Sequence, residues 1–114
     1  MFDFKNGEIF IAKFDPSVGH EFQKDRPAIV VQSDKKLLGS SLITIVGMTS
    51  SAKNMRRDDI LVKKDSFNRL YLDSVIKVGA IYSFDRSRFI KKIGRIDPAI
   101  MNQIKSYLKT HFDL

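Results

Sequence analysis

The chain has 114 residues, 43% hydrophobic and 29% charged, a composition that indicates one globular domain over residues 1–114 rather than a disordered segment. Its 20 Lys and Arg against 13 Asp and Glu give a net charge of +7, which is typical of nucleic-acid-binding proteins and equally of proteins with a merely basic surface. With no cysteine and two histidines, the composition excludes disulfides, cysteine-based zinc sites and thiol nucleophiles, and we expect no metal or other cofactor.

The sequence contains no candidate membrane segment. Its longest nearly apolar run, 42–48, is far shorter than the ~20 residues that a membrane-spanning helix needs. No basic segment followed by an apolar stretch opens the chain, as it would in a secretory signal. We therefore expect a cytoplasmic protein with no membrane contact.

The excess positive charge is unevenly distributed along the chain. Residues 1–34 hold four basic and six acidic side chains, a net charge of −2. Residues 35–114 hold sixteen basic and seven acidic side chains, a net charge of +9. The later part of the chain is therefore the candidate surface for a polyanion.

Short strands account for the first two thirds of the sequence. Runs rich in β-branched and aromatic residues predict them at 8–14, 28–32, 42–46, 59–63, 74–78 and 80–84. The unbroken apolar runs among them favour strands covered on both faces. Several short strands at close spacing favour a small barrel, because closure removes exposed edges. We expect a mainly β (α+β) fold: a small SH3-like barrel, closed or half-closed.

The period of the sequence changes near its end. Asp97 followed by Pro98 is typical of a helix start, with a side chain that caps the first turn and a proline that needs no hydrogen-bond partner there. Apolar residues then recur at helical spacing. The pattern predicts one amphipathic C-terminal α-helix over 97–112, packed on the sheet.

The connection at 15–27 carries the candidate chemistry. It is long for a link between two strands, and long loops on a rigid barrel are frequent sites of binding and catalysis. The planar guanidinium of Arg26 matches two phosphate oxygens, although an ion pair with Asp25 or Glu21 would also explain it. His20 has an ordinary pKa near neutrality and is a candidate for proton transfer, or else a solvated imidazole.

Three segments carry a resemblance to a known family. Residues 7–10 read GEIF, 15–21 read DPSVGHE and 26–33 read RPAIVVQS. In this order they resemble the MazF/PemK/Kid toxins of bacterial toxin–antitoxin pairs. Weaker similarity at 48–50, 73–77 and 85–95 extends the match from about residue 7 to residue 108. The GHE and RP pairing is its specific part.

The resemblance implies a MazF-type β-barrel homodimer that cuts single-stranded RNA, such as mRNA, without a metal. It places the family's catalytic arginine on Arg26 and its threonine on Thr49, and a histidine used in the PemK/Kid branch on His20. An arginine and an aspartate of that branch fall on Lys77 and Gly79, and glycine has no acid–base group. We expect the RNA 2′-OH to attack, which leaves 2′,3′-cyclic phosphate and 5′-OH ends and spares DNA.

In this mechanism Arg26 holds the phosphate, Thr49 donates a hydrogen bond to it, and His20 or, with a raised pKa, Glu21 removes the 2′-OH proton. Glu21 has the alternative role of holding Arg26. Phe22 and Tyr82 are candidate stacking surfaces or core residues. Lysines such as Lys91 and Lys92 are interpreted as solvated surface. The full set of expected RNA-binding residues is Glu21, Phe22, Gln23, Lys24, Ser50, Lys53, Arg56 and Lys77.

The resemblance also implies a cognate antitoxin with an acidic, partly disordered segment that folds on this basic protein, and DNA binding by the complex of the two. Two alternatives stay open. One is a gyrase-binding toxin of the same fold, like CcdB, which needs no set such as Arg26, Thr49 and His20. The other is a catalytically inactive barrel that binds nucleic acid or a partner.

Overall fold

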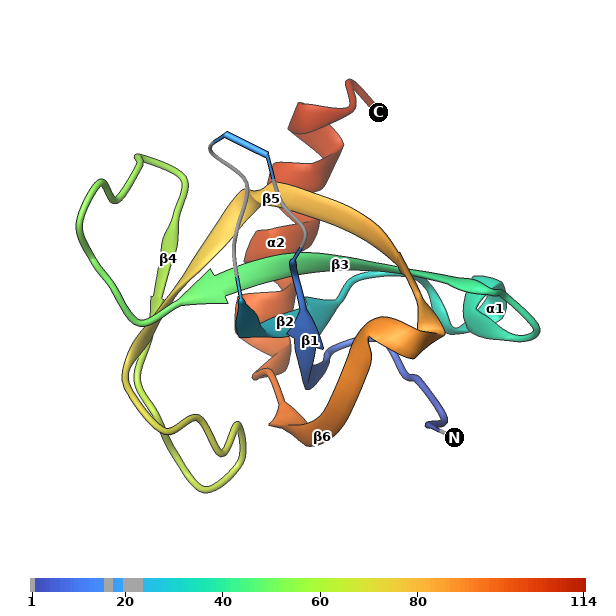
Figure 1. Cartoon of the computed structure of the whole chain (residues 1–114). Coiled ribbons are helices and arrows are strands. Elements are labelled where there is room, and N and C mark those ends of the chain that lie inside the picture. Colours follow the sequence, from blue (N-terminus) through green and yellow to red (C-terminus); the bar gives the residue numbers. More distant parts are fainter. Residues whose placement is uncertain (1, 16–17, 20–23) are drawn as a thin grey trace.

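A single antiparallel sheet with the strand order β4-β5-β3-β2-β1-β6 organises the computed structural model, which describes residues 2–15, 18–19 and 24–114 (Figure 1). The described elements are β1 (Glu8–Lys13), β2 (Asp25–Val30), α1 (Asp34–Leu37), β3 (Leu42–Thr49), β4 (Ile60–Val62), β5 (Ser74–Asp85), the 3-10 turn η1 (Arg86–Arg88), β6 (Phe89–Arg95) and α2 (Pro98–His111). The sheet curls into a half-barrel with one C-terminal helix, so the predicted mainly β fold class is confirmed.

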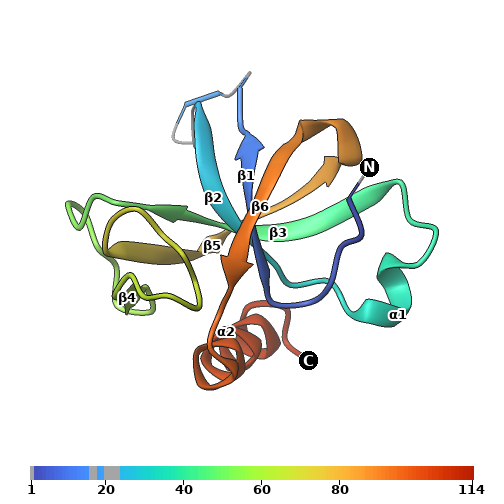
Figure 2. The same ribbon diagram turned by 90° about the horizontal axis from the view of Figure 1, so that it is seen from below.

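Both faces of the sheet are covered by apolar side chains. Neighbours in β1 alternate between them: Ile9 packs in the cluster that includes Met101 and Ile104 of α2, and Phe10 packs in an aromatic cluster with Phe4 and Phe89. Figure 2 shows α2 on one side of the sheet and the end of β1 and the start of β2 at the opposite side. The continuous apolar runs of the sequence thus belong to strands that are largely covered on both faces, with residues 28–30, Ile43, Ile45 and Val46 buried and Leu42 exposed at the strand end.

The prediction of two separate strands at 74–78 and 80–84 is wrong, because both belong to β5. Strand β5 is one strand whose register against β3 shifts, since Val46 pairs with Ile81 while Gly47 pairs with Lys77. The extra residues of β5 form a bulge around Gly79, and bulges bend a strand and increase its twist. The hydroxyl of Tyr107 on α2 lies 3.3 Å from where a Cβ on Gly79 would stand. The helix therefore packs closely against the bend.

Strand β2 begins earlier than predicted. Asp25, Arg26 and Pro27, expected in the connection, already pair with β1, with Arg26 opposite Ala12. The pairing of β2 with β3 covers only Ala28 to Val30. Proline has no N–H to donate, so it is tolerated where one side of a strand is unpaired. The two strands part at Pro27, and the end of β3 continues beyond the ladder.

The C-terminal helix agrees with the prediction. It spans Pro98–His111, and the side chain of Asp97 accepts a hydrogen bond from the Ala99 N–H. The one-turn helix α1 and the turn η1 were not predicted, because three or four residues leave no periodic pattern. Among the described residues, no helix is both long and apolar enough to cross a membrane.

The connection between β4 and β5, residues 63–73, is built around Asn68, whose side chain is 3% exposed. The Asn68 amide oxygen accepts from the N–H groups of Asp65 and Leu70, and its nitrogen donates to the Lys63 carbonyl. A Cβ on Gly94 of β6 would lie 2.3 Å from the Asn68 carbonyl oxygen. The connection is therefore held against β6 through a contact that only glycine permits.

Replacing Gly94 with alanine should destabilise the fold by about 1–3 kcal/mol, because the new methyl group meets backbone atoms that must move. Urea unfolding of the variant measures this loss. Gly79→Ala is the matched control, since its methyl group would meet only the movable end of Tyr107. Equal stabilities of the Gly94→Ala and Gly79→Ala variants would contradict the close contact.

Candidate functional site

Arg26 and Thr49 meet where β2 and β3 part. Arg26 Nη1 donates a hydrogen bond of 3.1 Å to Thr49 Oγ1, and both side chains are half-buried. Arg26 comes from the start of β2, which pairs with β1 but not with β3, and Thr49 is the last residue of β3. The two residues on which the sequence placed the central chemistry are thus in direct contact.

The Thr49 hydroxyl is oriented by its partners. Its oxygen accepts one bond from Arg26 and another of 3.2 Å from the Ser51 N–H. A threonine hydroxyl has two acceptor positions and one hydrogen to donate. With both acceptor positions in use, the hydroxyl hydrogen remains for a third group. The predicted role of Thr49 as a donor to a phosphate oxygen fits this geometry.

A pocket of about 380 Å³ opens beside this pair. Arg26 and Thr49 at strand ends, Ser50 directly after β3 and Ser74 at the start of β5 are four of its polar lining residues. The remaining lining residues are Ile11, Asp25, Pro27, Leu70, Tyr71, Leu72, Lys91 and Ile93. The pocket therefore places a cation and a hydroxyl at the border of an apolar surface, an arrangement suited to a phosphate attached to a flat, weakly polar group.

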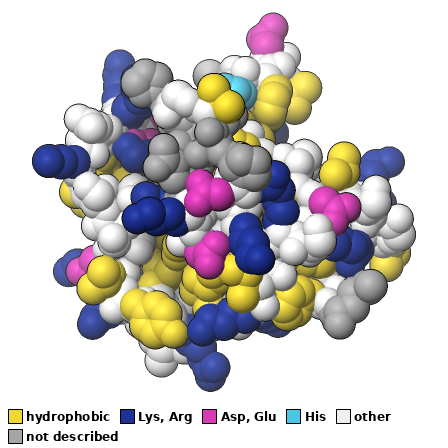
Figure 3. All heavy atoms as spheres, in the orientation of Figure 1, with side chains coloured by type: hydrophobic (Ala, Val, Ile, Leu, Met, Phe, Trp, Pro, Cys, Tyr) yellow, Lys and Arg dark blue, Asp and Glu magenta, His cyan; other side chains and the backbone are white. Residues whose placement is uncertain are grey.

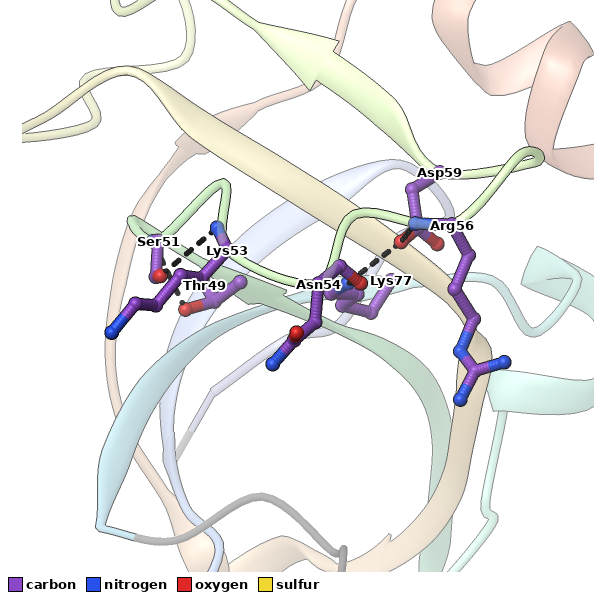
Figure 4. A network of polar contacts seen from close by, with 7 residues as sticks. All are labelled: Thr49, Ser51, Lys53, Asn54, Arg56, Asp59 and Lys77. Atoms are coloured by element: carbon purple, nitrogen blue, oxygen red, sulfur yellow. Dashed lines mark hydrogen bonds and ion pairs between the residues drawn. The ribbon is translucent and has the colours of Figure 1, made fainter.

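The connection from Thr49 to β4 carries three more of the predicted RNA-binding residues (Figure 4). Ser50 lines the pocket, and Lys53 follows in the next turn, where its N–H donates to Ser51 Oγ at 3.3 Å. Lys53 and Arg56 are exposed, and Figure 4 shows both side chains extending away from the polar network.

Lys77 has a different position from the one expected. Its ammonium forms an ion pair with Asp59 at 2.7 Å and donates to the Asn54 carbonyl at 3.0 Å. The Asp59 side chain is 4% exposed and also accepts from the Arg56 N–H at 2.8 Å. A carboxylate so deeply buried needs a close cationic partner. Lys77 therefore holds the connection after Thr49 in place (Figure 4), a positioning role that the sequence does not reveal.

Four predicted residues, His20, Glu21, Phe22 and Gln23, lie outside the described residues. The next residue, Lys24, is exposed and has a positive φ of 64°.

The ends of the β1–β2 connection are tied together. The Lys24 carbonyl accepts from the Phe14 N–H at 2.9 Å. Arg88 Nη1 donates to the carbonyls of Lys13 and Asp15 at 3.1 and 3.0 Å. Both ends of the connection that contains His20 in the sequence therefore adjoin β1 and β2, two strands that contribute lining residues to the pocket.

Several lining residues were missed or interpreted differently from the sequence. Lys91 and Lys92 are exposed, as predicted, but Lys91 also lines the pocket and Lys92 forms an ion pair with Glu8, whose side chain is 6% exposed. Tyr82 packs with the aromatic cluster and stacks on Phe84 at 5.3 Å, which places it with the core. No local pattern signals the contacts of Lys91 and Lys92, because they join segments far apart in the sequence.

The surface around the site combines apolar and basic side chains. Figure 3 shows apolar side chains gathered over the lower part of one face, where Figure 1 draws β6 and the β4–β5 connection, with Lys and Arg around them. Across residues 2–15, 18–19 and 24–114, no group of three His, Asp or Glu side chains could hold a metal ion.

Comparison with known proteins identifies the family. Residues 5–112 match the family model of the PemK-like, MazF-like toxin of type II toxin–antitoxin systems. The chain is 31% identical over 115 residues to endoribonuclease MazF9 of Mycobacterium tuberculosis, covering 96% of this chain and 97% of that protein. It is 30% identical over 108 residues to endoribonuclease EndoA of Bacillus subtilis, covering 92% and 90%.

Solved structures agree on the fold. MazF from Deinococcus radiodurans superposes with a TM-score of 0.85 at 20% identity, over 100% of both chains. A mycobacterial endoribonuclease in complex with its cognate antitoxin superposes with a TM-score of 0.77 at 15% identity, over 98% and 97% of the two chains. The expected resemblance is confirmed: this chain belongs to the family of PemK-like, MazF-like toxins of type II toxin–antitoxin systems.

Proposed function

We propose that this chain is the toxin of a type II toxin–antitoxin pair and an endoribonuclease that cuts single-stranded RNA, including mRNA, in the cytoplasm without a metal ion. The observation that carries the proposal is the Arg26–Thr49 contact at the edge of a pocket, in a chain of this family. Its relatives MazF9 and EndoA are named endoribonucleases. A gyrase-binding toxin would have no use for this pair, so the nuclease is favoured over that alternative.

The reaction begins with attack of the RNA 2′-oxygen on the adjacent phosphorus. The new O–P bond forms as the bond from phosphorus to the 5′-oxygen breaks, which leaves a 2′,3′-cyclic phosphate and a 5′-OH. Negative charge grows on the non-bridging oxygens, where fixed donors stabilise the transition state most. Arg26 supplies the charge there, and Thr49 donates the hydroxyl hydrogen that its two accepted bonds leave over.

Two proton transfers complete the reaction. The 2′-OH proton must go to a base, and the departing 5′-oxygen must receive a proton. We assign the base to His20, whose ordinary pKa suits neutral conditions, with Glu21 as the alternative if its pKa is raised. The RNA strand then contacts Ser50, Lys53 and the other predicted binding residues on the two connections.

The family and the net charge of the chain indicate two protein partners, an antitoxin and a second copy of the chain. The net charge of +7 favours an acidic antitoxin segment as the natural inhibitor, and a relative has been solved with its cognate antitoxin. We also expect a homodimer, as the resemblance implies. Sedimentation velocity measures this directly, and a particle of one-chain mass at every concentration would contradict it.

The activity is tested by incubating the purified chain with mixed-sequence single-stranded RNA in excess EDTA and mapping the new ends. We expect cuts restricted to a short sequence, with 2′,3′-cyclic phosphate and 5′-OH ends and no cuts in the matching DNA. Intact RNA at high enzyme concentration would refute the nuclease, and activity restored only by added metal would refute metal-independent cleavage.

The same reaction followed from pH 4 to pH 8 distinguishes the two bases. With His20 as base, the rate rises with pH and levels above about 6.5, the ordinary histidine pKa. His20→Gln then lowers the plateau rate by about 10²–10⁴-fold. An unchanged dependence of rate on pH in His20→Gln would show that Glu21 or another group is the base.

Arg26→Ala and Thr49→Val should each lower the cleavage rate by about 100- to 1000-fold, the usual loss when one donor to transition-state charge is removed. Because both residues act on one phosphate, the double variant should lose far less than the product of the single effects. Single-turnover rates on one RNA measure all three.

The matched control is Thr44→Val in the same strand, since the Thr44 hydroxyl bonds Ser83 Oγ at 2.7 Å and does not line the pocket. We expect it to cleave normally, and Thr49→Ser to recover most of the rate. Arg26→Ala should keep nearly the melting temperature of the unaltered chain. A large fall in that temperature would make Arg26 a structural residue instead.

A further inference from the structure

Tyr71, Leu72 and Lys91, here called the ledge, form the exposed side of the pocket. Tyr71 is 74% and Leu72 58% exposed, although both are large apolar side chains. Lys91 Nζ donates to the Tyr71 hydroxyl at 3.3 Å and lies 5.7 Å from the centre of its ring. Two such side chains exposed side by side at the edge of a pocket give an apolar surface of the kind that lines ligand-binding grooves.

The ledge and the reactive pair line the same pocket. Arg26, Thr49 and the three ledge residues all border its 380 Å³ volume, with Ile11 and Leu70 also in the lining. A phosphate held by Arg26 therefore has an apolar surface and an aromatic ring within the same pocket. A nucleotide offers matching groups, because it joins a phosphate to a sugar and a flat base.

The ledge is held rigidly. Tyr71 and Leu72 belong to the β4–β5 connection, in which Asn68 bonds three backbone groups and Asp73 accepts from the Lys64 N–H at 2.9 Å. The contact of Asn68 with Gly94 fixes the connection on β6, the strand that supplies Lys91. Because the backbone of this connection is already ordered, binding loses less conformational entropy there, which favours higher affinity.

The charges at the pocket favour RNA over an apolar peptide. Arg26 and Lys91 are its two cations, and Asp25 is the single carboxylate among the described lining residues. Aromatic rings beside cations are the usual means by which proteins hold single-stranded RNA, since each base offers a π-face and each phosphate a charge.

We propose that Tyr71 stacks on an RNA base next to the cleaved bond, with Lys91 binding an adjacent phosphate. The proposal rests on the proposed function and names a subsite of the same substrate. Stacking tolerates any base, so the subsite contributes affinity and holds the strand in line with Arg26 without selecting a sequence.

The test uses the RNA cut by the unaltered chain, made resistant by a 2′-deoxy substitution at the cut. We expect Tyr71→Ala to raise its Kd, measured by fluorescence anisotropy, about 5- to 150-fold, the loss of one stacked base. Tyr71→Phe keeps the ring and should bind within about twofold. Phe67→Ala is the matched control, an exposed aromatic of the same connection that lies outside the pocket.

Removing single bases locates the stack. An abasic nucleotide at one position beside the cut should weaken binding to the unaltered chain as much as Tyr71→Ala does, and should not weaken binding to that variant further. Additive losses at every position would overturn the proposal while leaving the nuclease intact. Loss of binding to an acidic antitoxin segment alone, with RNA affinity unchanged, would overturn it in favour of a protein-docking surface.

Binding and cleavage are separable in this test. Where the chain cuts no RNA, the same comparison of Kd values uses the mixed-sequence single-stranded RNA of the activity assay, because stacking tolerates any base, so a failed nuclease assay does not decide the outcome. Tyr71 is mostly exposed, and urea unfolding should give equal stabilities for the Ala and Phe variants. If Tyr71→Ala unfolds, Tyr71→Leu takes its place, and unchanged affinity in that variant refutes stacking.

Discussion

The hydrogen bond from Arg26 to Thr49 depends on where the ladder between β2 and β3 stops. Continued pairing would place the start of β2 against the end of β3, and the pocket between them would close. Pro27 has no N–H for such pairing, so the strands separate one residue after Arg26. A single proline next to the arginine thus both ends the ladder and opens the space in which a phosphate can be held.

The basic residues at and around the site have different structural roles. Arg26 lies in the part of the sequence with net charge −2, whereas most of the basic excess lies beyond residue 34. Lys77 serves the buried Asp59 and so positions the connection that follows Thr49. Lys53 and Arg56, which extend from that connection, are exposed to solvent and to a polyanion. The general positive charge and the oriented charge of Arg26 thus come from different parts of the sequence.

Local sequence patterns predict the parts of the fold that obey a simple period. The apolar runs at 28–32 and 42–46 and the capped helix after Asp97 were found in this way. The edge strand β6 was not predicted, because apolar and polar residues do not alternate along it. Strand β5 was predicted as two strands, because its bulge interrupts the apolar pattern at Gly79. The start of β2 was misplaced because proline is typical of turns, and a strand with one free side is an exception.

The candidate site was predictable to the extent that it resembles a family. Arg26 and Thr49 were found from their motifs, and the structure brings them into contact. The part played by Tyr71 and Lys91 depends on β6 lying beside the β4–β5 connection, and Lys77 meets Asp59 across two strands. Contacts between distant segments leave no trace in one sequence, so these residues become visible only in three dimensions.

The internal bonds of the basic residues change what the net charge means for counterions. Lys77 and Lys92 neutralise carboxylates, Arg88 holds the carbonyls of Lys13 and Asp15, and Arg86 Nε donates to the Ser40 carbonyl at 2.7 Å. Lys77 and Lys92 therefore add little net charge at their positions, whereas Arg86 and Arg88 bond uncharged carbonyls and keep their positive charge. The number of cations released on binding, and with it the salt sensitivity of affinity, reports the side chains that contact phosphates and not the net charge of +7.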